Sequence, residues 1–146
     1  MINFIFDFCN TMIAPFWLLM IFMPKWKWTI RIISSHVPVL IFAIVYIIFI
    51  IPGIITLLPI VAKPDLGKIV KLLGTEEGTT IAWIHIIAFD LFVGRWIYLY
   101  SLRNQLSPWI ISPILFLSLM FGPFGYATFI TIDRLVLKTK PEEIAT

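Results

Sequence analysis

The chain has 146 residues, of which 60% are hydrophobic and 13% charged, and its mean hydropathy is +1.00. A soluble domain would carry roughly 25% charged residues, so the composition argues against a water-soluble enzyme, a disordered chain and a repeat solenoid, and indicates a protein covered by lipid. The net charge of +3 comes from basic residues that lie between apolar stretches, as membrane flanks do, so we expect no nucleic-acid partner. The single cysteine, Cys9, excludes an intramolecular disulfide and a cysteine-rich metal site.

Four stretches of the chain are long and apolar enough to cross a hydrocarbon core, which needs roughly 20 helical residues. They run from about Asn3 to Met23, from Val37 to Ala62, from about Thr79 to Tyr100 and from about Ser107 to Ile132. Over residues 66–73, apolar side chains recur at helical spacing with lysines off that stripe, which predicts a short helix in the membrane interface between the second and third spans. We therefore expect an all-α integral membrane protein, with one domain of four transmembrane helices over residues 1–137 and a polar C-terminal tail over residues 138–146.

The ends of these segments carry their own signals. Asp65 opens the short interfacial helix and Gly74 can end it, while Thr75 can cap a third span that has two glutamates in its first turn. The connection at residues 104–108 is short, so we expect the third and fourth spans to be antiparallel neighbours. The first basic residue follows the first apolar stretch, which favours a span over a signal peptide. With four crossings, the distribution of basic residues slightly favours both ends of the chain on the cytoplasmic side.

An imidazole, a carboxylate and a guanidinium lie within the third span, where each needs a partner or a function. Counting from Thr79 at about 1.5 Å per residue places His85 roughly 9 Å and Asp90 roughly 16 Å into the membrane, with Arg95 near the far interface. A spacing of five residues leaves two side chains about 140° apart around a helix, so partners for His85 and Asp90 must come from other helices. Gly94 would let a neighbouring helix approach closely on the face of Asp90.

The first span offers such partners. A small polar stripe is formed by Asp7, Asn10, Thr11 and Ala14. The first and third spans run in the same direction, which places Asn10 and Thr11 at a depth between His85 and Asp90. The sequence therefore predicts a site between these two helices.

The fourth span contains the sequence Gly122-Pro123-Phe124-Gly125. Because a proline inside a helix removes an amide donor, Pro123 predicts a kink near mid-depth. Tyr126 and Thr128 follow the kink, and we expect them on the same half of the membrane as Asn10.

Each of these residues also has a structural interpretation, which the sequence leaves open. Asn10 can serve only to join helices, Asp90 can be part of an ion pair or a neutral buried carboxyl, and His85 can be a packing residue. His36 lies roughly 20 Å along the membrane normal from His85, so the two cannot clamp one haem iron. No HExxH, CxxC, GxSxG or phosphate-loop motif is present, so no metal site, hydrolase or nucleotide chemistry is expected.

A set of motifs spans most of the chain. The third span reads Ala82-Trp83-Ile84-His85, then Asp90-Leu91-Phe92, then Arg95 and Tyr98, with Ala14-Pro15-Phe16 before it and Phe121-Gly122-Pro123-Phe124-Gly125 after it. In these motifs the chain resembles the abscisic-acid-deficient-type membrane proteins from about Thr11 to Ile132. The residues that match the family pattern position by position are Trp83, His85, Asp90, Arg95 and Tyr98. Plant members of that family are needed to make the xanthophyll neoxanthin from violaxanthin, so the resemblance implies a protein of carotenoid metabolism in a thylakoid or bacterial inner membrane.

The reaction implied by this resemblance converts an epoxide to an allenic alcohol without net redox change. It needs an acid at the epoxide oxygen and a base at a neighbouring carbon. We expect His85 and Asp90 to be the catalytic acid–base candidates. The residues expected to position a carotenoid between the helices are Asn10, Trp83, Arg95 and Tyr98.

The sequence also leaves a second class of function open. The chain would then be a non-enzymatic small subunit of a photosynthetic pigment–protein complex, in which His85 ligates chlorophyll. A small transporter has weak support, because there is one mid-membrane charge and no inverted repeat. No cofactor is required by the sequence, and the expected partners are the lipid bilayer, a carotenoid and a larger photosynthetic or carotenoid-synthesis complex.

Overall fold

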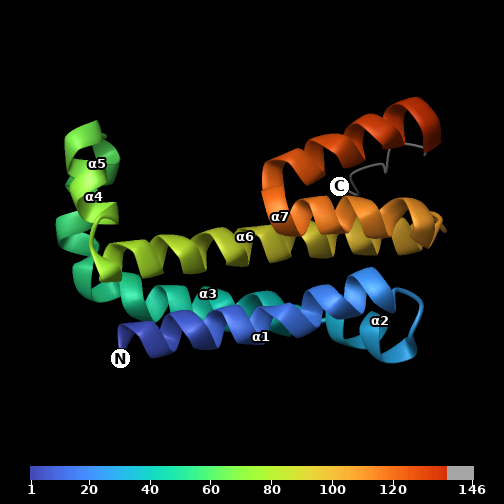
Figure 1. The fold of residues 1–146 in the computed structure, drawn as a ribbon, viewed down its shortest axis with the longest axis horizontal. Helices are drawn as coiled ribbons and strands as arrows, with labels where there is room; N and C mark the ends of the chain where they lie inside the picture. Colours follow the sequence, from blue (N-terminus) through green and yellow to red (C-terminus); the bar gives the residue numbers. More distant parts are fainter. Residues whose placement is uncertain (138–146) are drawn as a thin grey trace, which may run out of the picture.

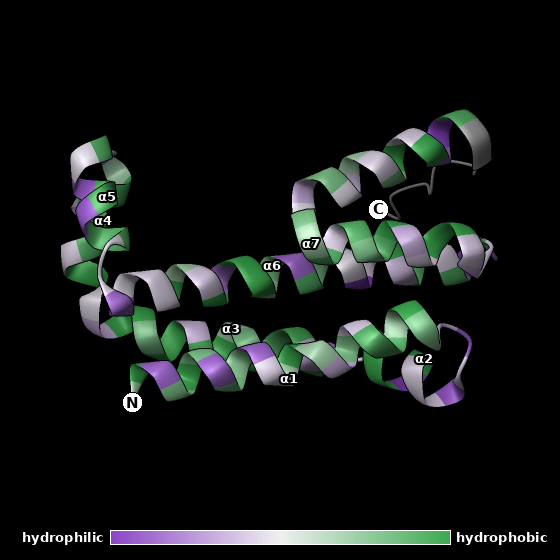
Figure 2. Ribbon diagram, in the orientation of Figure 1, coloured by the Kyte–Doolittle hydropathy of each residue, from purple (hydrophilic) through white to green (hydrophobic). Residues whose placement is uncertain are grey.

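The computed structural model describes residues 1–137, and the predicted polar tail at residues 138–146 lies outside them. The described chain is helical and contains no strand. Its elements are α1 (Ile2–Phe22), α2 (Lys27–Ser34), α3 (Val37–Ile50), the short 3-10 helix η1 (Ile51–Gly53), α4 (Ile54–Ala62), α5 (Leu66–Leu73), α6 (Glu76–Arg103), α7 (Pro108–Ile132) and the π-helical turn η2 (Asp133–Leu137). Four segments are long and apolar enough to cross a membrane: Ile2–Phe22, Val37–Ala62, Glu76–Arg103 and Pro108–Leu135. The prediction of an all-α membrane protein is confirmed, and Figure 2 shows how hydrophobic residues dominate the long helices.

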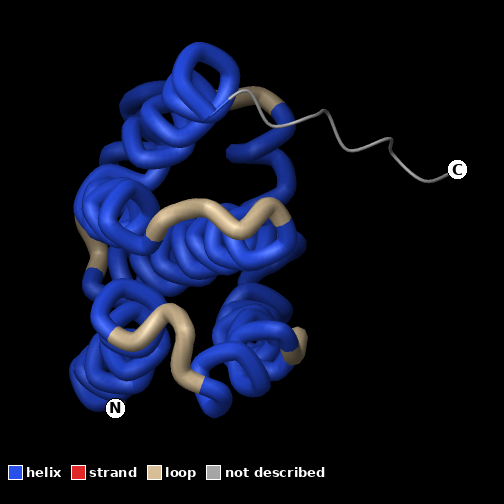
Figure 3. The backbone as a smooth tube through the Cα atoms, turned by 90° about the vertical axis from the view of Figure 1, so that its right-hand side faces the viewer, coloured by secondary structure: helices blue, strands red, loops and turns tan. Residues whose placement is uncertain are grey.

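The helices α1, α3 and α6 lie lengthwise in the molecule, and α1 and α6 run in the same direction (Figure 1). Figure 3 shows the molecule from the end at which α6 and α7 are joined, with short loops between the helices. The core between α1, α6 and α7 is built from buried apolar side chains, the largest being Trp17, Tyr98 and Phe129. Gly94 allows the close approach of α1 and α6, because a Cβ at that position would overlap the ring of Trp17.

The predicted helix ends are confirmed. Asp65 caps α5, with its Oδ1 accepting a 3.0 Å hydrogen bond from the Lys68 amide, and the helix ends at Gly74. Thr75 caps α6, with its Oγ1 accepting a 3.0 Å hydrogen bond from the Gly78 amide. These caps satisfy amides that have no partner inside their own helix, and they fix where each helix begins.

Three features depart from the pattern of straight spans and plain linkers. The segment after Pro24 contains the extra helix α2, where the sequence indicated only a turn-rich connection. The second span bends at Pro52 and Gly53 in η1, so that α4 turns away from α3 and stands beside α5, crosswise to α6 (Figure 1). A proline next to a glycine weakens the helix at this point, which hydropathy alone does not reveal.

The third departure is in α7, which reverses its direction midway. Its backbone leaves the helical region at Phe121, with φ −144° and ψ 60°, just before Pro123. The second half then returns along α6, where the rings of Tyr126 and Phe129 lie 5.7 and 5.6 Å from the ring of Trp96. Figure 1 shows the two halves of α7 as the arms of a hairpin. We call this the α7 hairpin, and its tip lies at residues 121–123.

The predicted kink at Pro123 is therefore confirmed, and it is larger than the sequence indicated. The prediction that Tyr126 shares the half of the membrane that holds Asn10 is wrong. A straight α7 would carry Tyr126 past Asp90 toward the beginning of α6, whereas the reversal returns it to Trp96. Gly125 permits the reversal, because a Cβ there would overlap the backbone of Ser118 on the first arm of the hairpin.

Candidate functional site

His85 lies at the surface of α6, facing α3. Its ring centroid is 5.1 Å from that of Tyr46 on α3 and 5.0 Å from that of Phe89, one helical turn further along α6. Within residues 1–137, the imidazole nitrogens of His85 make no hydrogen bond. His85 is thus held by ring contacts and keeps its nitrogens available for a ligand.

Two apolar recesses meet at His85 and Tyr46. The first has a volume of about 270 Å³ and is lined by Val39, Ala43, Tyr46, His85, Ala88, Phe89 and Phe92. The second has a volume of about 300 Å³ and is lined by Tyr46, Ile50, Leu57, Val61, Leu72, Leu73, Gly78, Ile81, Ala82, His85 and Ile86. Because both recesses share the His85–Tyr46 pair, we treat them as one feature, the α3–α6 groove, which runs between α3 and α6 and ends under α4 and α5.

Asp90, the other acid–base candidate, lies on a different side of α6. Its carboxyl is set against the tip of the α7 hairpin, where a Cβ on Gly122 would overlap Asp90 Oδ1. Five residues of helix separate Asp90 from His85, which leaves them about 140° apart. The structure therefore does not bring the two candidate catalytic residues into one site between the first and third spans, where the sequence predicted them, because His85 faces α3 and Asp90 faces α7.

Asn10 and Trp83 do meet across two helices. Trp83 Nε1 on α6 donates a 2.8 Å hydrogen bond to Asn10 Oδ1 on α1, and Asn10 Nδ2 donates a 2.8 Å hydrogen bond to the Phe6 carbonyl. This pair joins the polar stripe of α1 to the third span. Asp7 and Thr11, which belong to the same stripe, are exposed at the protein surface.

Arg95 and Tyr98 bind the backbone near α2 and border neither recess of the groove. Arg95 Nε donates to the Ile33 and Ser35 carbonyls at 2.7 and 3.1 Å, and a terminal nitrogen donates to the Ser34 carbonyl at 2.7 Å. The guanidinium thus satisfies the free carbonyls at the end of α2. The Tyr98 hydroxyl donates a 2.6 Å hydrogen bond to the Pro24 carbonyl. Both residues hold the connection between α1 and α3 against α6, so their observed contacts are structural.

Sequence reasoning missed Tyr46. It is the only polar side chain in residues 37–55, and this isolation within a fully apolar stretch was a signal that could have found it. Its partner in the groove, however, belongs to another helix, and only the packing of α3 on α6 shows that Tyr46 faces His85.

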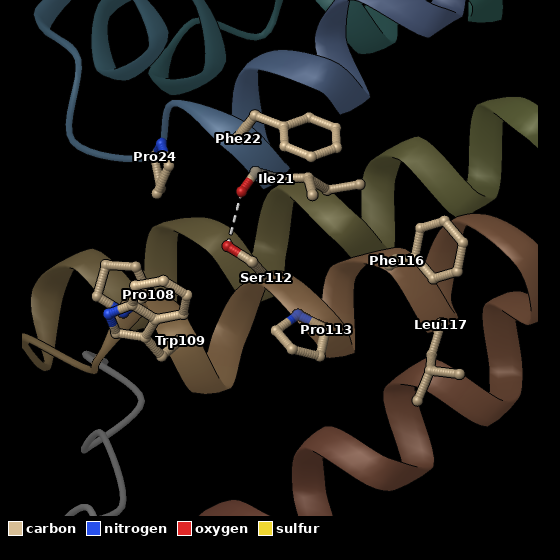
Figure 4. Close-up of a pocket in the computed structure, with 9 residues that line it drawn as sticks. All are labelled: Ile21, Phe22, Pro24, Pro108, Trp109, Ser112, Pro113, Phe116 and Leu117. Carbon is tan, nitrogen blue, oxygen red and sulfur yellow. Dashed lines mark hydrogen bonds between the residues drawn. The ribbon is translucent and has the colours of Figure 1, made fainter.

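A larger recess lies elsewhere in the described chain and has a volume of about 750 Å³. Figure 4 shows it between the end of α1 and the first arm of the α7 hairpin, with Trp109 and Pro113 on one side and Phe22 on the other. Its Ser112 hydroxyl is already used, donating a 2.7 Å hydrogen bond to the Ile21 carbonyl. No titratable side chain lines this recess, so it suits an acyl chain better than it suits proton transfer.

No metal centre is found in residues 1–137, since no three His, Cys, Asp or Glu side chains cluster there. The titratable side chains that line the α3–α6 groove are His85 and Tyr46, and Asp90 lies at the hairpin tip.

Comparison with known proteins gives a consistent result. A family model described as ABA DEFICIENT 4-like matches residues 4–129. The chain is 30% identical over 130 residues to the Protein ABA DEFICIENT 4, chloroplastic, of Arabidopsis thaliana, with 83% of this chain aligned. The aligned region covers 56% of that protein, so the chain spans little more than half the length of its plant relative. No solved structure matches the chain.

Proposed function

This chain belongs to the ABA DEFICIENT 4-like family, and from that premise we propose that it acts in carotenoid metabolism and binds a carotenoid in the α3–α6 groove. Its place would be a carotenoid-containing membrane, either a thylakoid or a bacterial inner membrane. The observation that carries the proposal is the groove itself, in which apolar walls surround one imidazole and one phenol.

The shape of the groove supports this ligand. A carotenoid is a long apolar rod with polar groups confined to its ends, and it dissolves only in the bilayer. The α3–α6 groove is open at the surface of the helices and continues on both sides of His85, so a rod can lie along it. Aromatic and branched side chains line it, as they line most sites for apolar ligands.

The same groove offers an acid–base pair for the finer proposal, an epoxide isomerisation. One proton goes to the epoxide oxygen, a carbon–oxygen bond of the ring breaks, and one proton leaves a neighbouring carbon, so that atoms and electrons balance without an oxidant. The Tyr46 hydroxyl and the His85 imidazole supply a donor and an acceptor within one recess. Asp90, which the sequence paired with His85, lies outside the recesses that His85 borders, and this proposal gives it no proton-transfer step with His85.

Binding is tested by expressing the full chain in a host that makes epoxy-xanthophylls and purifying it in mild detergent. The retained pigment is then identified by chromatography and mass spectrometry. We expect the wild type to retain a carotenoid. Ala88→Phe, which fills the groove, should lose most of the pigment, whereas Ala127→Phe, on an exposed part of α7, should retain it. Equal retention by the two variants would contradict the assignment to this groove.

Catalysis is tested in the same host by following the conversion of epoxide to allenic product. His85→Gln should keep the bound carotenoid and lower the rate by roughly 10²–10⁴-fold, the usual contribution of a general acid or base. His36→Gln is the matched control, because His36 is exposed at the beginning of α3 and lines neither recess of the groove. Product formation at the wild-type rate by His85→Gln would remove His85 from the reaction.

The free nitrogens of His85 also favour a second candidate, a pigment-binding subunit in which His85 ligates the magnesium of chlorophyll. In a chlorophyll-containing host, His85→Ala would then release chlorophyll without changing carotenoid composition. A native gel would show the wild type migrating with a larger complex. The carotenoid proposal expects neither result.

A further inference from the structure

The tip of the α7 hairpin is an irregular piece of backbone in which Gly122 is buried against α6, whereas the side chains of Phe121 and Pro123 are exposed. Phe121 leaves the helical region, and Pro123 has no amide hydrogen, so the carbonyl four residues earlier, that of Leu119, has no helical donor. Within a membrane, such backbone is tolerated only where it is buried in protein or lines a polar cavity. The side chains that face the tip therefore indicate which kind of ligand could bind there.

Two of these side chains are polar and lack partners. The Asp90 carboxyl lies against Gly122 and makes no hydrogen bond or ion pair within residues 1–137. Ser118, on the first arm of the hairpin, is 0% exposed, and its hydroxyl also has no partner in the described chain. An isolated carboxylate at this depth is costly, so it marks a place where a counter-charge or a donor belongs.

Both residues pack against the same part of the second arm, Asp90 through its carboxyl and Ser118 through its backbone and Cβ. Gly122 and Gly125 are three residues apart and so share one face of that arm. A Cβ on Gly122 would overlap Asp90, and a Cβ on Gly125 would overlap Ser118. Asp90 and Ser118 thus lie beside one small-residue face at the beginning of a half-helix, next to backbone carbonyls freed by the break.

We propose that the tip of the α7 hairpin binds a monovalent metal cation of the sodium type. Its ligands would be the Asp90 carboxylate, the Ser118 hydroxyl and backbone carbonyls near Phe121. All of these are oxygen atoms, which hard cations prefer, and broken membrane helices bind sodium through the same kinds of group. One carboxylate balances one positive charge, and the absence of an acidic cluster in residues 1–137 argues against a divalent ion.

The register of α1 on α6 supplies a route to this site. The Asn10–Trp83 hydrogen bond and the contact of Trp17 with Gly94 place Ala14, between them in α1, at about the level of Asp90. The polar residues of α1, including the exposed Asp7 and Thr11, lie between that level and the beginning of the helix. A cation would enter along this stripe, on the side of α6 away from the α3–α6 groove.

The test is thermal unfolding of the purified full chain in detergent, in NaCl, KCl or choline chloride at equal ionic strength. A thiol-reactive dye reports unfolding, because Cys9 is the single cysteine and is buried. A ligand that binds only the folded state raises the unfolding midpoint, and the rise grows with the logarithm of its concentration. We expect a rise of several degrees in a metal salt relative to choline.

Variants assign the effect to the tip. Asp90→Asn should abolish the salt response, and Ser118→Ala should move its half-saturation to a higher concentration. Asp7→Asn should keep the wild-type response, because Asp7 lies on the exposed part of α1 outside the proposed ligands and an entry route does not change the binding equilibrium. If the wild type unfolds at the same midpoint in all three salts, the proposal is overturned; a protonated Asp90 would give this result. The proposal is also overturned if Asp90→Asn keeps the wild-type salt response. Pigment retention in the groove is measured separately, so either proposal can fail without the other.

Discussion

The two longest helices of the molecule, α6 with 28 residues and α7 with 25, follow different paths. α6 carries His85, Asp90 and Arg95 and yet stays helical from end to end, whereas the uncharged α7 reverses at Phe121. The difference lies in the backbone. α6 contains no proline, and the ring of Trp17 occupies the space beside its Gly94. In α7, by contrast, Pro123 directly follows Gly122. In this pair the break therefore occurs at the Gly122-Pro123 step and not at the polar side chains, whereas Pro15 in α1 and Pro113 in α7 lie inside continuous helix.

The largest expected effect concerns the side of the membrane on which α7 ends, because this tests whether α7 doubles back in the bilayer while α6 crosses it. If the hairpin persists in the bilayer, Arg134 emerges on the same side as Lys27, and Lys68 lies on the opposite side. Four straight crossings would instead place Arg134 with Lys68. In a Cys9→Ser background, single variants Lys27→Cys, Lys68→Cys and Arg134→Cys are labelled in intact and opened cells with a maleimide that does not cross membranes. We expect the first and third to label alike and the second to differ.

The same experiment sets the orientation. With α7 doubled back, the end of the molecule that holds α2 carries the larger set of described basic residues, namely Lys25, Lys27, Arg31, Arg103 and Arg134. The other end carries Lys63, Lys68 and Lys71. The rule that basic loops stay inside then places α2 on the cytoplasmic side, with the beginning of α1 across the membrane. Labelling of Lys68→Cys in intact cells supports this orientation, and labelling of Lys27→Cys in intact cells contradicts it.

The next largest effect is expected where the arms of the hairpin touch. In Gly125→Ala the new Cβ meets the backbone of Ser118, which cannot move aside as a side chain can. We expect a loss of about 3 kcal/mol or more, at the upper end of overpacking effects, measured as a lower thermal midpoint in detergent. Gly53→Ala is the matched control, because the nearest atom to its Cβ would be a Leu57 side-chain carbon at 3.6 Å. Similar midpoints for the two variants would show that the arms are not packed as described.

A smaller effect is expected at the contact between α1 and α6. Gly94→Ala should cost about 1–3 kcal/mol, because the Trp17 ring that it displaces is only 1% exposed. Trp17→Leu leaves room for the new methyl group, so the double variant should lose less stability than the sum of the two single variants. Strict additivity in this cycle would mean that the two residues do not touch.

Much of the fold could be predicted because its signals are local. The caps at Asp65 and Thr75 depend on the next three residues, and the lengths of the apolar stretches fix which segments can span. The reversal of α7 could not be predicted in the same way. Pro123 shows that the helix is weakened, but the size of the bend is set by Gly125 packing on Ser118, a contact within the folded hairpin.

The same contrast between local sequence signals and contacts made by packing holds for the candidate site. Helical spacing separated His85 from Asp90, and the parallel course of α1 and α6 predicted the meeting of Asn10 with α6. Tyr46 and Gly122, which face His85 and Asp90, come from α3 and α7, and their register on α6 is fixed only by packing. The sequence could therefore identify His85 and Asp90 as candidates, but it could not show that Tyr46 and Gly122 face them.

The smallest effect is expected at the hydrogen bond that joins the polar stripe of α1 to α6. Asn10→Ala and Trp83→Phe each remove the 2.8 Å bond from Trp83 Nε1 to Asn10 Oδ1. Hydrogen bonds between membrane helices contribute about 0.6 kcal/mol on average, so a double-variant cycle on the unfolding midpoint should give a coupling of that size. A coupling well above about 1.7 kcal/mol, the largest seen for such bonds, would mean that this pair and not the Gly94 contact holds α1 in register. Since that register sets the position of α1 at the level of Asp90, both variants would then also weaken the salt response at the hairpin tip.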